Sequence, residues 1–583
     1  MIIANIDVSN FNIFAEHSSK PCADHEVSSK TGKNNTILSA ENSGKIHGLV
    51  FILLGLALLA FLFAPVRSFC DEIQSNSKNV KEWGAKGDGI TDDTSAIQKA
   101  IGASAGRVLY LPPGKYLVES LSLLSRSTLR GAGAESCSLV LRQRSEKSAP
   151  NLLQGIDVSN LEISGIHFYG SRQSDTDGDG QAVYVLAHAK NCENIKIHDC
   201  TFENFRGAGV VRVSGNTKAG KVLFQIKDVR IEKNRFLNNY DINPASLSHA
   251  ANSIYLHSGV SNFNISDNNI DGTYNKMGIS IFSNAWDGHV TRNIIENCGM
   301  HQSGVYGYGI LLYSLRDTTV ENITVSNNQI RKTRRMGLYL QTVNNIVISG
   351  NVIDSCDVNA DDTTLPAGSI VLNMDTAAKG EVLISNNIIT HTKYAGIQIY
   401  NHKGSCRVVV DGNMINGADE NGKPIGACGI VLRDGAKDVQ ITNNNVTNCK
   451  FAGVFIYNIT SPMSNLLLSK NHLTNTGIGI TNNSNIKSIS NIRVTDNVVN
   501  CNGSVGIQLG YVNGGLVSNN AINVTGLYGA IFTGSDISVR DNVIIGSNRG
   551  GTGIILRGEN KNKHVENYKL NNISGFSTKL VVE

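Results

Sequence analysis

Residue types suited to contacting a sugar recur in short segments that open on glycine. In GISIFS from residue 278, GIQIYN from 396 and GVFIYN from 453, aliphatic side chains alternate with other residue types. In a β-strand this alternation sends the aliphatics to one face and the remaining side chains to the other. The predicted outward column reads His257, Phe282, Tyr313, Gln341, Asn373, Tyr400, Arg433 and Tyr457, and a companion column reads Tyr255, Ser280, Leu311, Tyr339, Val371, Gln398, Val431 and Phe455.

These two columns suggest a surface for an elongated acidic polysaccharide. Aromatic rings stack on sugar faces, amides bond hydroxyl groups, and cations in the turns before the strands neutralise carboxylates. The residues predicted to contact substrate are His257, Tyr313, Arg334, Gln341, Gln398, Tyr400 and Tyr457. The alternative is that any stack of strands needs outward residues, and that tyrosine is simply a good strand former.

The same face carries candidates for catalysis. Elimination at a uronate needs a base for the C5 proton and a cation that stabilises the carboxylate as charge develops. Arg335, Tyr339 and Lys393 are predicted to fill these roles. Hydrolysis would instead need two carboxylates, about 5–5.5 Å or about 6.5–9.5 Å apart. Asp375 and the pair at 361–362 are the candidates for that chemistry, with a solvated turn as the alternative for each.

A possible calcium loop lies in SDTDGDGQAV, residues 174–183. Asp175, Asp177 and Asp179 occupy ligand positions, but the twelfth position is Leu186, so the bidentate glutamate of such loops is missing. The segment is therefore either a Ca²⁺ site or a flexible acidic turn. No other cofactor is predicted, because the eleven cysteines form no CxxC pair and the histidines share no spacing.

Composition and one apolar segment limit the location and partners. A net charge of +4 over 583 residues predicts no nucleic-acid partner. Residues 48–66 carry no charge and are long enough to cross a bilayer, so 48–69 is predicted to be an export signal or an uncleaved membrane anchor. Residues 1–47 are expected to form a disordered polar tail, and the rest to lie outside the cytoplasm. A buried core helix is the alternative for 48–66, and the oligomeric state is left open.

The elements that must position these residues come from an internal repeat. Segments such as NITVSN from 322 and NIVISG from 345 alternate with the glycine-opening segments every 22–36 residues. That is too short for strands joined by helices, and glycine (58) outnumbers proline (9) in a chain with few charges. The pattern predicts an all-β fold, a single-stranded parallel β-helix over 78–583. A β-propeller is the alternative, although its blades need four strands in about 40–45 residues.

Further expectations follow from stacking the coils. The asparagine after each second strand is expected in a left-handed turn, with its amide bonded from coil to coil. Cys298, Cys356 and Cys449 each follow such an asparagine by five residues, so they are expected to be buried thiols in one column. A helix over 93–102, capped by Thr91 or Asp92, is expected to cover the apolar end of the stack.

The segment WGAKGDGITDDTSAIQKAI, followed by GRVLYLPPGKYLV, resembles the N-terminal motif of the pectate-lyase-like right-handed parallel β-helix superfamily. This resemblance implies a right-handed β-helix and a carbohydrate ligand. It does not fix the reaction, because the Asn-Thr-Asp, Asp-Asp, Gly-His-Gly and Arg-Ile-Lys set of polygalacturonases and the Asp-Pro-His motif of mannuronan epimerases are absent. The predicted function is binding and cleavage or modification of an acidic polysaccharide, as a lyase, hydrolase or epimerase. A non-catalytic glycan binder and a purely structural surface protein are the alternatives.

Overall fold

The computed structural model describes most of the second of two compact units, which spans 75–583. The described residues are 77–142, 151–170, 180–205, 209–239, 252–272, 277–300, 307–315, 317–357, 367–374, 378–400, 405–457, 461–482, 489–503, 505–547, 550–557 and 565–582. The predicted tail 1–47 and the segment 48–69 lie outside them. No helix among the described ranges is both long and apolar enough to cross a membrane.

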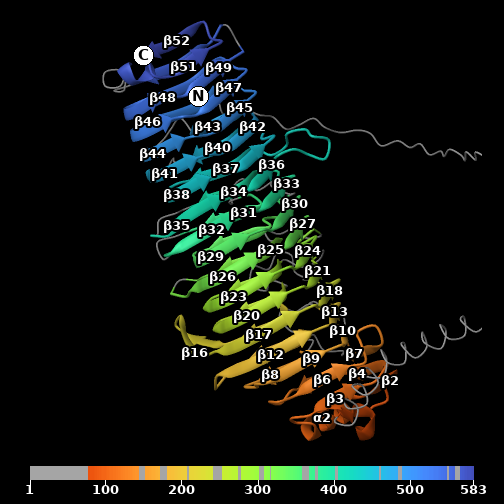
Figure 1. Ribbon diagram of the computed structural model, residues 1–583. Coiled ribbons are helices and arrows are strands. Elements are labelled where there is room, and N and C mark those ends of the chain that lie inside the picture. The colour runs from red at the N-terminus through yellow and green to blue at the C-terminus, as the bar shows by residue number, and fades with distance from the viewer. Residues whose placement is uncertain are drawn as a thin grey trace, which may run out of the picture. The chain divides into compact units, whose positions relative to one another are not determined.

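Three parallel stacks of strands build this unit, and successive coils lie side by side from the orange to the blue end of Figure 1. Each coil contributes one strand to each stack, as the run β25(Tyr308–Tyr313), β26(Val320–Ser326) and β27(Gln329–Arg331) illustrates. The next coil repeats the order with β28(Leu338–Gln341), β29(Asn344–Ser349) and β30(Val352–Asp354), each paired in parallel with its counterpart. The predicted parallel β-helix is therefore confirmed.

The first stack carries the predicted ring column. Its strands include β11(Val183–Leu186), β14(Gly209–Ser214), β19(Asn252–His257), β22(Met277–Phe282), β25, β28, β31(Ile370–Asn373), β34(Ala395–Tyr400), β37(Cys428–Arg433), β40(Ala452–Tyr457) and β43(Ile478–Asn482).

The second stack follows it along the chain. Its strands include β9(Leu161–Ser164), β12(Cys192–His198), β17(Ile226–Glu232), β20(Val260–Ser266), β23(Ala285–Thr291), β26, β29, β32(Glu381–Ser385), β35(Arg407–Asp411), β38(Lys437–Thr442), β41(Met463–Ser469) and β44(Ile489–Thr495).

The third stack is made of shorter strands. They include β10(His167–Tyr169), β13(Thr201–Glu203), β18(Arg235–Leu237), β21(Asn269–Asp271), β24(Ile294–Glu296), β27, β30, β33(Ile388–Thr390), β36(Met414–Asn416), β39(Asn445–Thr447) and β42(His472–Thr476). A small antiparallel hairpin, β15(Asn216–Lys218) with β16(Lys221–Phe224), interrupts the parallel order.

The core runs through the inside of the coils, as period-2 alternation requires. The aliphatics of the glycine-opening strands, such as Ile397 and Ile399, are fully buried. Cys298, Cys356 and Cys449 are buried and unbridged, as expected, and so are the other six described cysteines. Apolar burial at about 25 cal/mol per Å² stabilises such a stack coil by coil, each contacting only its neighbours.

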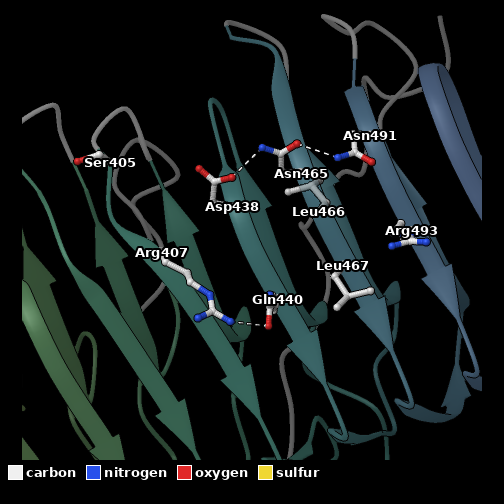
Figure 2. Close-up of a pocket in the computed structure, with 9 residues that line it drawn as sticks. All are labelled: Ser405, Arg407, Asp438, Gln440, Asn465, Leu466, Leu467, Asn491 and Arg493. Carbon is white, nitrogen blue, oxygen red and sulfur yellow. Dashed lines mark hydrogen bonds between the residues drawn. The ribbon is translucent and has the colours of Figure 1, made fainter.

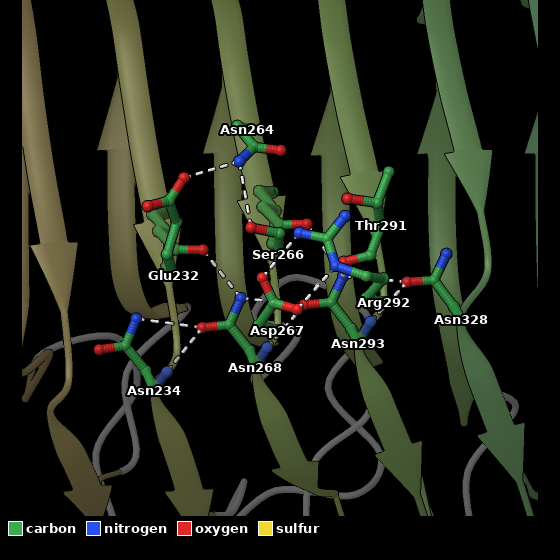
Figure 3. A network of polar contacts seen from close by, with 12 residues as sticks. Glu232, Asn234, Asn264, Ser266, Asp267, Asn268, Thr291, Arg292, Asn293 and Asn328 are labelled. Carbon is green, nitrogen blue, oxygen red and sulfur yellow. Dashed lines mark hydrogen bonds and ion pairs between the residues drawn. The ribbon is translucent and has the colours of Figure 1, made fainter.

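A ladder of buried asparagines locks one turn of every coil to the next (Figure 3). The Asn268 amide donates to Asn293 Oδ1 at 2.9 Å and to the Ile231 carbonyl at 2.8 Å, and Asn293 donates onward to Asn328 at 3.0 Å. The ladder comprises Asn234, Asn268, Asn293, Asn328, Asn351, Asn387, Asn413, Asn444, Asn471, Asn497, Asn520, Asn542 and Asn571. Its steps range from 22 to 36 residues, as predicted.

The expected left-handed conformation of these asparagines is wrong. Positive φ belongs to the residue before each of them except Asn571, such as Asp267 at 58° and Arg292 at 56°. That preceding residue turns the chain and sends its side chain outward, where Asp267 and Arg292 form two 2.8 Å bonds. The asparagine after it can then point inward and bond the next coil, because its own backbone stays extended enough to continue into the strand.

A short helix covers the N-terminal end of the stack. Helix α2(Thr94–Ala103) buries Ile97, Ala100 and Ile101, as expected. Its N-cap is Asp93 rather than Thr91 or Asp92, and the Asp93 carboxylate accepts from the backbone N–H groups of residues 86 and 87 instead of capping the helix. Asp92 caps from one position further back, accepting from the Thr94 N–H at 3.0 Å.

Candidate functional site

The register of the first stack places the predicted outward column in one line. His257 pairs with Phe282, Phe282 with Tyr313, and Tyr313 with Gln341. Gln341 pairs with Asn373, Asn373 with Tyr400, and Arg433 with Tyr457. All eight side chains are half-buried, so each presents part of its surface to solvent. We call His257, Phe282, Tyr313, Gln341, Asn373, Tyr400, Arg433 and Tyr457 the ring column.

Aromatic and cationic groups are stacked along this column. The rings of Phe282 and Tyr313 lie 4.9 Å apart and 1° from parallel, and His257 stacks on Phe282 at 5.6 Å. Farther along, the Arg433 guanidinium lies 4.7 Å from the ring centre of Tyr400 and 5.3 Å from that of Tyr457. Stacking of this kind fixes the rings in one orientation and leaves flat edges at one-coil steps.

Burial and a neighbouring cation keep His257 neutral. Desolvation first, and then the charge of Arg212, lower the pKa of this imidazole to about 4. Arg212 itself lies between the rings of Tyr184 and Tyr255, at 5.1 Å and 5.5 Å from their centres. Its two ring nitrogens lie 3.3 Å from the Ser214 hydroxyl and 3.2 Å from the Ser258 hydroxyl. At neutral pH His257 can therefore contact a ligand through its uncharged ring, not as a cation.

The middle of the ring column is polar. The Tyr339 hydroxyl donates to Gln341 Oε1 at 2.9 Å and accepts from the Asn373 amide at 3.1 Å. Burial raises the pKa of this phenol, so it keeps its proton at neutral pH. The predicted catalytic tyrosine and the predicted substrate contact Gln341 thus form one hydrogen-bonded group between two aromatic stretches.

The companion column is outward but largely buried, which overturns the prediction that it forms part of the exposed surface. Ser280, Val371 and Gln398 are fully buried, and Val371 packs in an apolar cluster with Met277, Tyr308, Leu311 and Met336. Gln398, predicted to contact substrate, instead accepts a 3.0 Å hydrogen bond from the Ala367 backbone N–H. Residues that precede the strands of the first stack, such as Ala367, therefore cover this column. Alternation within a strand shows the direction of a side chain but not whether another segment covers it.

Two of the predicted cations converge on a carboxyl group that was not predicted. Asp357, which follows β30, is fully buried, and neither carboxylate oxygen has a hydrogen-bond partner. Its backbone N–H donates to the Arg335 carbonyl at 2.7 Å. Desolvation raises the pKa of Asp357 to about 7, although the charges of Arg335 and Lys393 act in the opposite direction.

The predicted cations Arg334, Arg335 and Lys393 differ in exposure. Arg335 is 4% exposed, whereas Lys393 is exposed and Arg334 is half-buried. A detectable sequence signal existed for Asp357, because it follows Cys356 as Lys450 follows Cys449 in the cysteine column. The residue after these cysteines lies in the connection that leads from the third stack into the first stack.

Several predicted residues fall outside the described ranges. They are Asp375, the pair 361–362, and the calcium candidates Asp175, Asp177 and Asp179. Among the residues that are described, no group of three or more His, Cys, Asp or Glu side chains is arranged to hold a metal. The Ca²⁺ hypothesis therefore stays a prediction.

The described surface also has hollows on the second stack. One of them, about 430 Å³, is drawn in Figure 2 and runs across β35, β38, β41 and β44. Arg407 on its edge is neutralised by Glu381 at 3.0 Å and donates to Gln440 at 3.0 Å, while Asp438 accepts from Asn465 at 2.7 Å. Arg407 and Asp438 in this hollow are thus paired, whereas the exposed Arg493 on its far side makes no hydrogen bond or ion pair with another described residue.

Comparison with known proteins identifies the family. Residues 77–306 match the family model described as rhamnogalacturonase A/epimerase, pectate lyase-like. Three overlapping matches to the right-handed β-helix region, 273–415, 323–472 and 428–581, together run over more than half of the chain.

Individual relatives match shorter stretches. Mannuronan C5-epimerase AlgE6 of Azotobacter vinelandii is 34% identical over 113 residues, which are 17% of this chain and 13% of that protein. Alginate lyase 7 of the same organism is 32% identical over 126 residues, 18% of this chain and 14% of that protein. The match thus spans about one seventh of the length of these relatives.

Among solved structures, the tailspike protein of Escherichia coli bacteriophage HK620 in complex with a pentasaccharide is 14% identical, with a TM-score of 0.48 over 80% of this chain and 81% of that one. On the family matches and the observed coils, the chain belongs to the pectate lyase-like superfamily of right-handed β-helix proteins.

Proposed function

We propose that this protein binds an acidic polysaccharide along the ring column and cleaves or modifies it next to Tyr339. The observation that carries the proposal is the ring column itself, in which aromatic, amide and cationic side chains lie on successive coils in one line. Coils repeat at the strand spacing of about 4.8 Å, so a linear glycan lying along the column meets a new contact at each step.

The chemistry that best fits the described residues is proton transfer next to a uronate carboxylate. Arg335 and Lys393 would neutralise that carboxylate and stabilise charge that develops on it, an effect that is strongest in a site with little water. In elimination the C5–H and C4–O4 bonds would break: the C5 proton would pass to a solvent water or hydroxide, and the protonated Tyr339 phenol would give its proton to the departing O4 and regain one from solvent. In epimerisation the same phenol would return a proton to C5 from the opposite face. Asp357 faces both cations and would set their positions and net charge.

This chemistry is favoured over hydrolysis for a structural reason. Hydrolysis needs two carboxylates flanking the bond, and the ring column contains no acidic residue. The names of the two relatives, a mannuronan C5-epimerase and an alginate lyase, support a uronate as substrate.

Glycan binding without turnover is the second candidate. It is favoured by the burial of Arg335 and Asp357, which leaves Lys393 as the exposed member of the charged group in the described structure. A binder would hold the glycan through the rings and produce no new chain ends and no inverted C5 centres.

The test incubates the full chain with a panel of polyuronates and neutral polysaccharides. Absorbance of unsaturated uronates reports elimination, reducing-end release reports cleavage by either route, and proton exchange at C5 reports epimerisation. On a polyuronate we expect either unsaturated uronates or proton exchange at C5, and on neutral glycans we expect none of the three signals. Saturable binding without any of the three signals would establish the binder, and no binding to any polyuronate would refute both candidates.

A further inference from the structure

The second stack carries two cations, Lys196 and Arg230, on adjacent coils. Lys196 on β12 pairs directly with Arg230 on β17 in the parallel register, so the two side chains leave the sheet about 4.8 Å apart. Neither makes a hydrogen bond or ion pair with another residue in the described part of the chain. Like charges placed directly opposite on neighbouring strands destabilise a sheet, so this pair costs stability in the free protein.

The carboxylates near this pair are bound to other partners. Glu162 lies 3.2 Å from His198 Nε2, Glu232 accepts from the Asn264 amide at 2.6 Å, and Asp228 accepts from the Asn262 amide. Figure 3 shows the Asn264 amide held between Glu232 and Ser266. Glu162 lies opposite Lys196 on the other neighbouring strand, and the Lys196 charge contributes to lowering the pKa of Glu162. The exposed Arg230 has Lys196 and Asn264 as its neighbours in the register, so its charge is directed at solvent.

This pair borders another hollow on the second stack, which is larger than the hollow of Figure 2. The hollow measures about 620 Å³ and is lined by Asn194, Lys196, Asp228, Arg230, Asn262, Phe263, Asn264 and His289. His289 continues the line of Lys196, Arg230 and Asn264 from coil to coil. Cations at one end, with carboxamides and an imidazole alongside, match an anionic group that is joined to a body rich in hydroxyls.

We propose that this hollow is a second glycan-binding site, separate from the ring column, in which Lys196 and Arg230 hold the acidic group of an anionic saccharide. The arginine can bond a carboxylate or sulfate through two parallel N–H groups, and the lysine adds a point charge. The hollow of Figure 2 lacks such a pair, because Arg407 is bound to Glu381 and the remaining cation, Arg493, has Leu467 as its register neighbour. The site does not depend on any reaction at the ring column.

The test measures binding of a uronate octasaccharide to the full chain by titration calorimetry, at low and at moderate salt. The double variant Lys196→Ala/Arg230→Ala is expected to weaken one class of site by at least about tenfold, with the loss larger at low salt because exposed charges are screened. Tyr313→Ala is expected to weaken the other class and to leave this one unchanged. Failure at the ring column and failure here can thus be told apart.

The matched control is Lys218→Ala/Lys221→Ala, which removes the same charge from two exposed lysines of the β15–β16 hairpin. It is expected to bind the octasaccharide as the unaltered protein does. Equal binding by Lys196→Ala/Arg230→Ala and by this control would overturn the proposal. Inorganic phosphate or sulfate that competes as well as the octasaccharide does would also overturn it, because the site would then recognise a simple anion and not a glycan.

Discussion

The rings of Phe282 and Tyr313 are stacked 4.9 Å apart and 1° from parallel, although 30 residues separate them along the chain. Their stacking follows from the register, because the two residues are paired on adjacent strands of the first stack. A pair of this kind contributes about 0.5–1.5 kcal/mol beyond the area it buries. It also holds both rings edge-on to solvent, which is the orientation that the ring column offers to a ligand.

Replacement of Tyr313 should separate binding from folding. Tyr313→Ala removes a half-buried ring at the surface of the column, so we expect polyuronate affinity to fall about three- to tenfold, corresponding to about 0.5–1.5 kcal/mol of stacking. The melting temperature should fall modestly, because the stacking on Phe282 is lost while the aliphatic core beneath is untouched. Calorimetric titration measures the affinity. Tyr169→Ala, an exposed tyrosine of the third stack, is the control, and an equal loss of affinity there would contradict the assignment.

Removal of one hydroxyl should test the proposed proton donor. Tyr339→Phe keeps the ring but loses the bonds to Gln341 and Asn373. We expect turnover of the active polyuronate to fall by about 10²–10⁴, the range typical of proton-transfer groups, with little change in KM. Steady-state kinetics on the full chain measure this. Retention of turnover within a few-fold would exclude Tyr339 as the donor.

The ionisation of Asp357 should make stability depend on pH. Its pKa is about 7 in the folded protein and near 3.8 when exposed, so the folded state holds a proton that the unfolded chain has lost between these values. Stability from this group is therefore fully present below pH 4, falls as pH rises toward 7 and is level above it. Asp357→Asn removes the dependence. Scanning calorimetry from pH 4 to 8 should show a wild-type melting temperature that falls relative to the variant.

The matched control for that experiment is Asp496→Asn, which removes an exposed carboxylate from the turn after β44 of the second stack. Its melting temperature should run parallel to that of the wild type over the whole range. A wild type that runs parallel to Asp357→Asn instead would mean that Asp357 is already charged in the folded protein at pH 4.

A buried asparagine of the ladder and an exposed asparagine outside it allow a paired test of burial. Asn351 is fully buried and donates to Val325, Ser349 and Asn387, so Asn351→Ala leaves ladder partners unsatisfied inside the protein. We expect a loss of about 1–3 kcal/mol, the cost of a buried unmade hydrogen bond. Asn523→Ala removes an exposed amide that donates to Asn500 at 2.7 Å, from a residue without positive φ, and should cost less than about 0.5 kcal/mol.

Thermal or denaturant unfolding of both variants measures the difference. An equal loss for Asn351→Ala and Asn523→Ala would show that the buried hydrogen bonds of the ladder contribute no more than exposed ones.

The sequence by itself determined the coil. Period-2 alternation determines which side chains of a strand face inward, such as those of Ile397 and Ile399. The recurring asparagine determines the length of each coil, because one strand register brings both the inward aliphatics and the asparagines into line. The ring column followed for the same reason: residues at equal offsets from the glycine that opens each strand must lie over one another. The buried cysteine column rested on the same equality of offsets.

Only the tertiary structure decided what covers each outward side chain and which charges meet. Gln398 alternates outward as predicted, yet it is fully buried beneath the Ala367 backbone, which belongs to a connection whose length varies between coils. Arg335, Asp357 and Lys393 lie in the connection from the third to the first stack in three successive coils, but these connections differ in length, so the repeat does not show which of their charges meet. Alternation records the direction of a side chain from its own strand, whereas burial and ionisation depend on groups that approach from elsewhere in the fold.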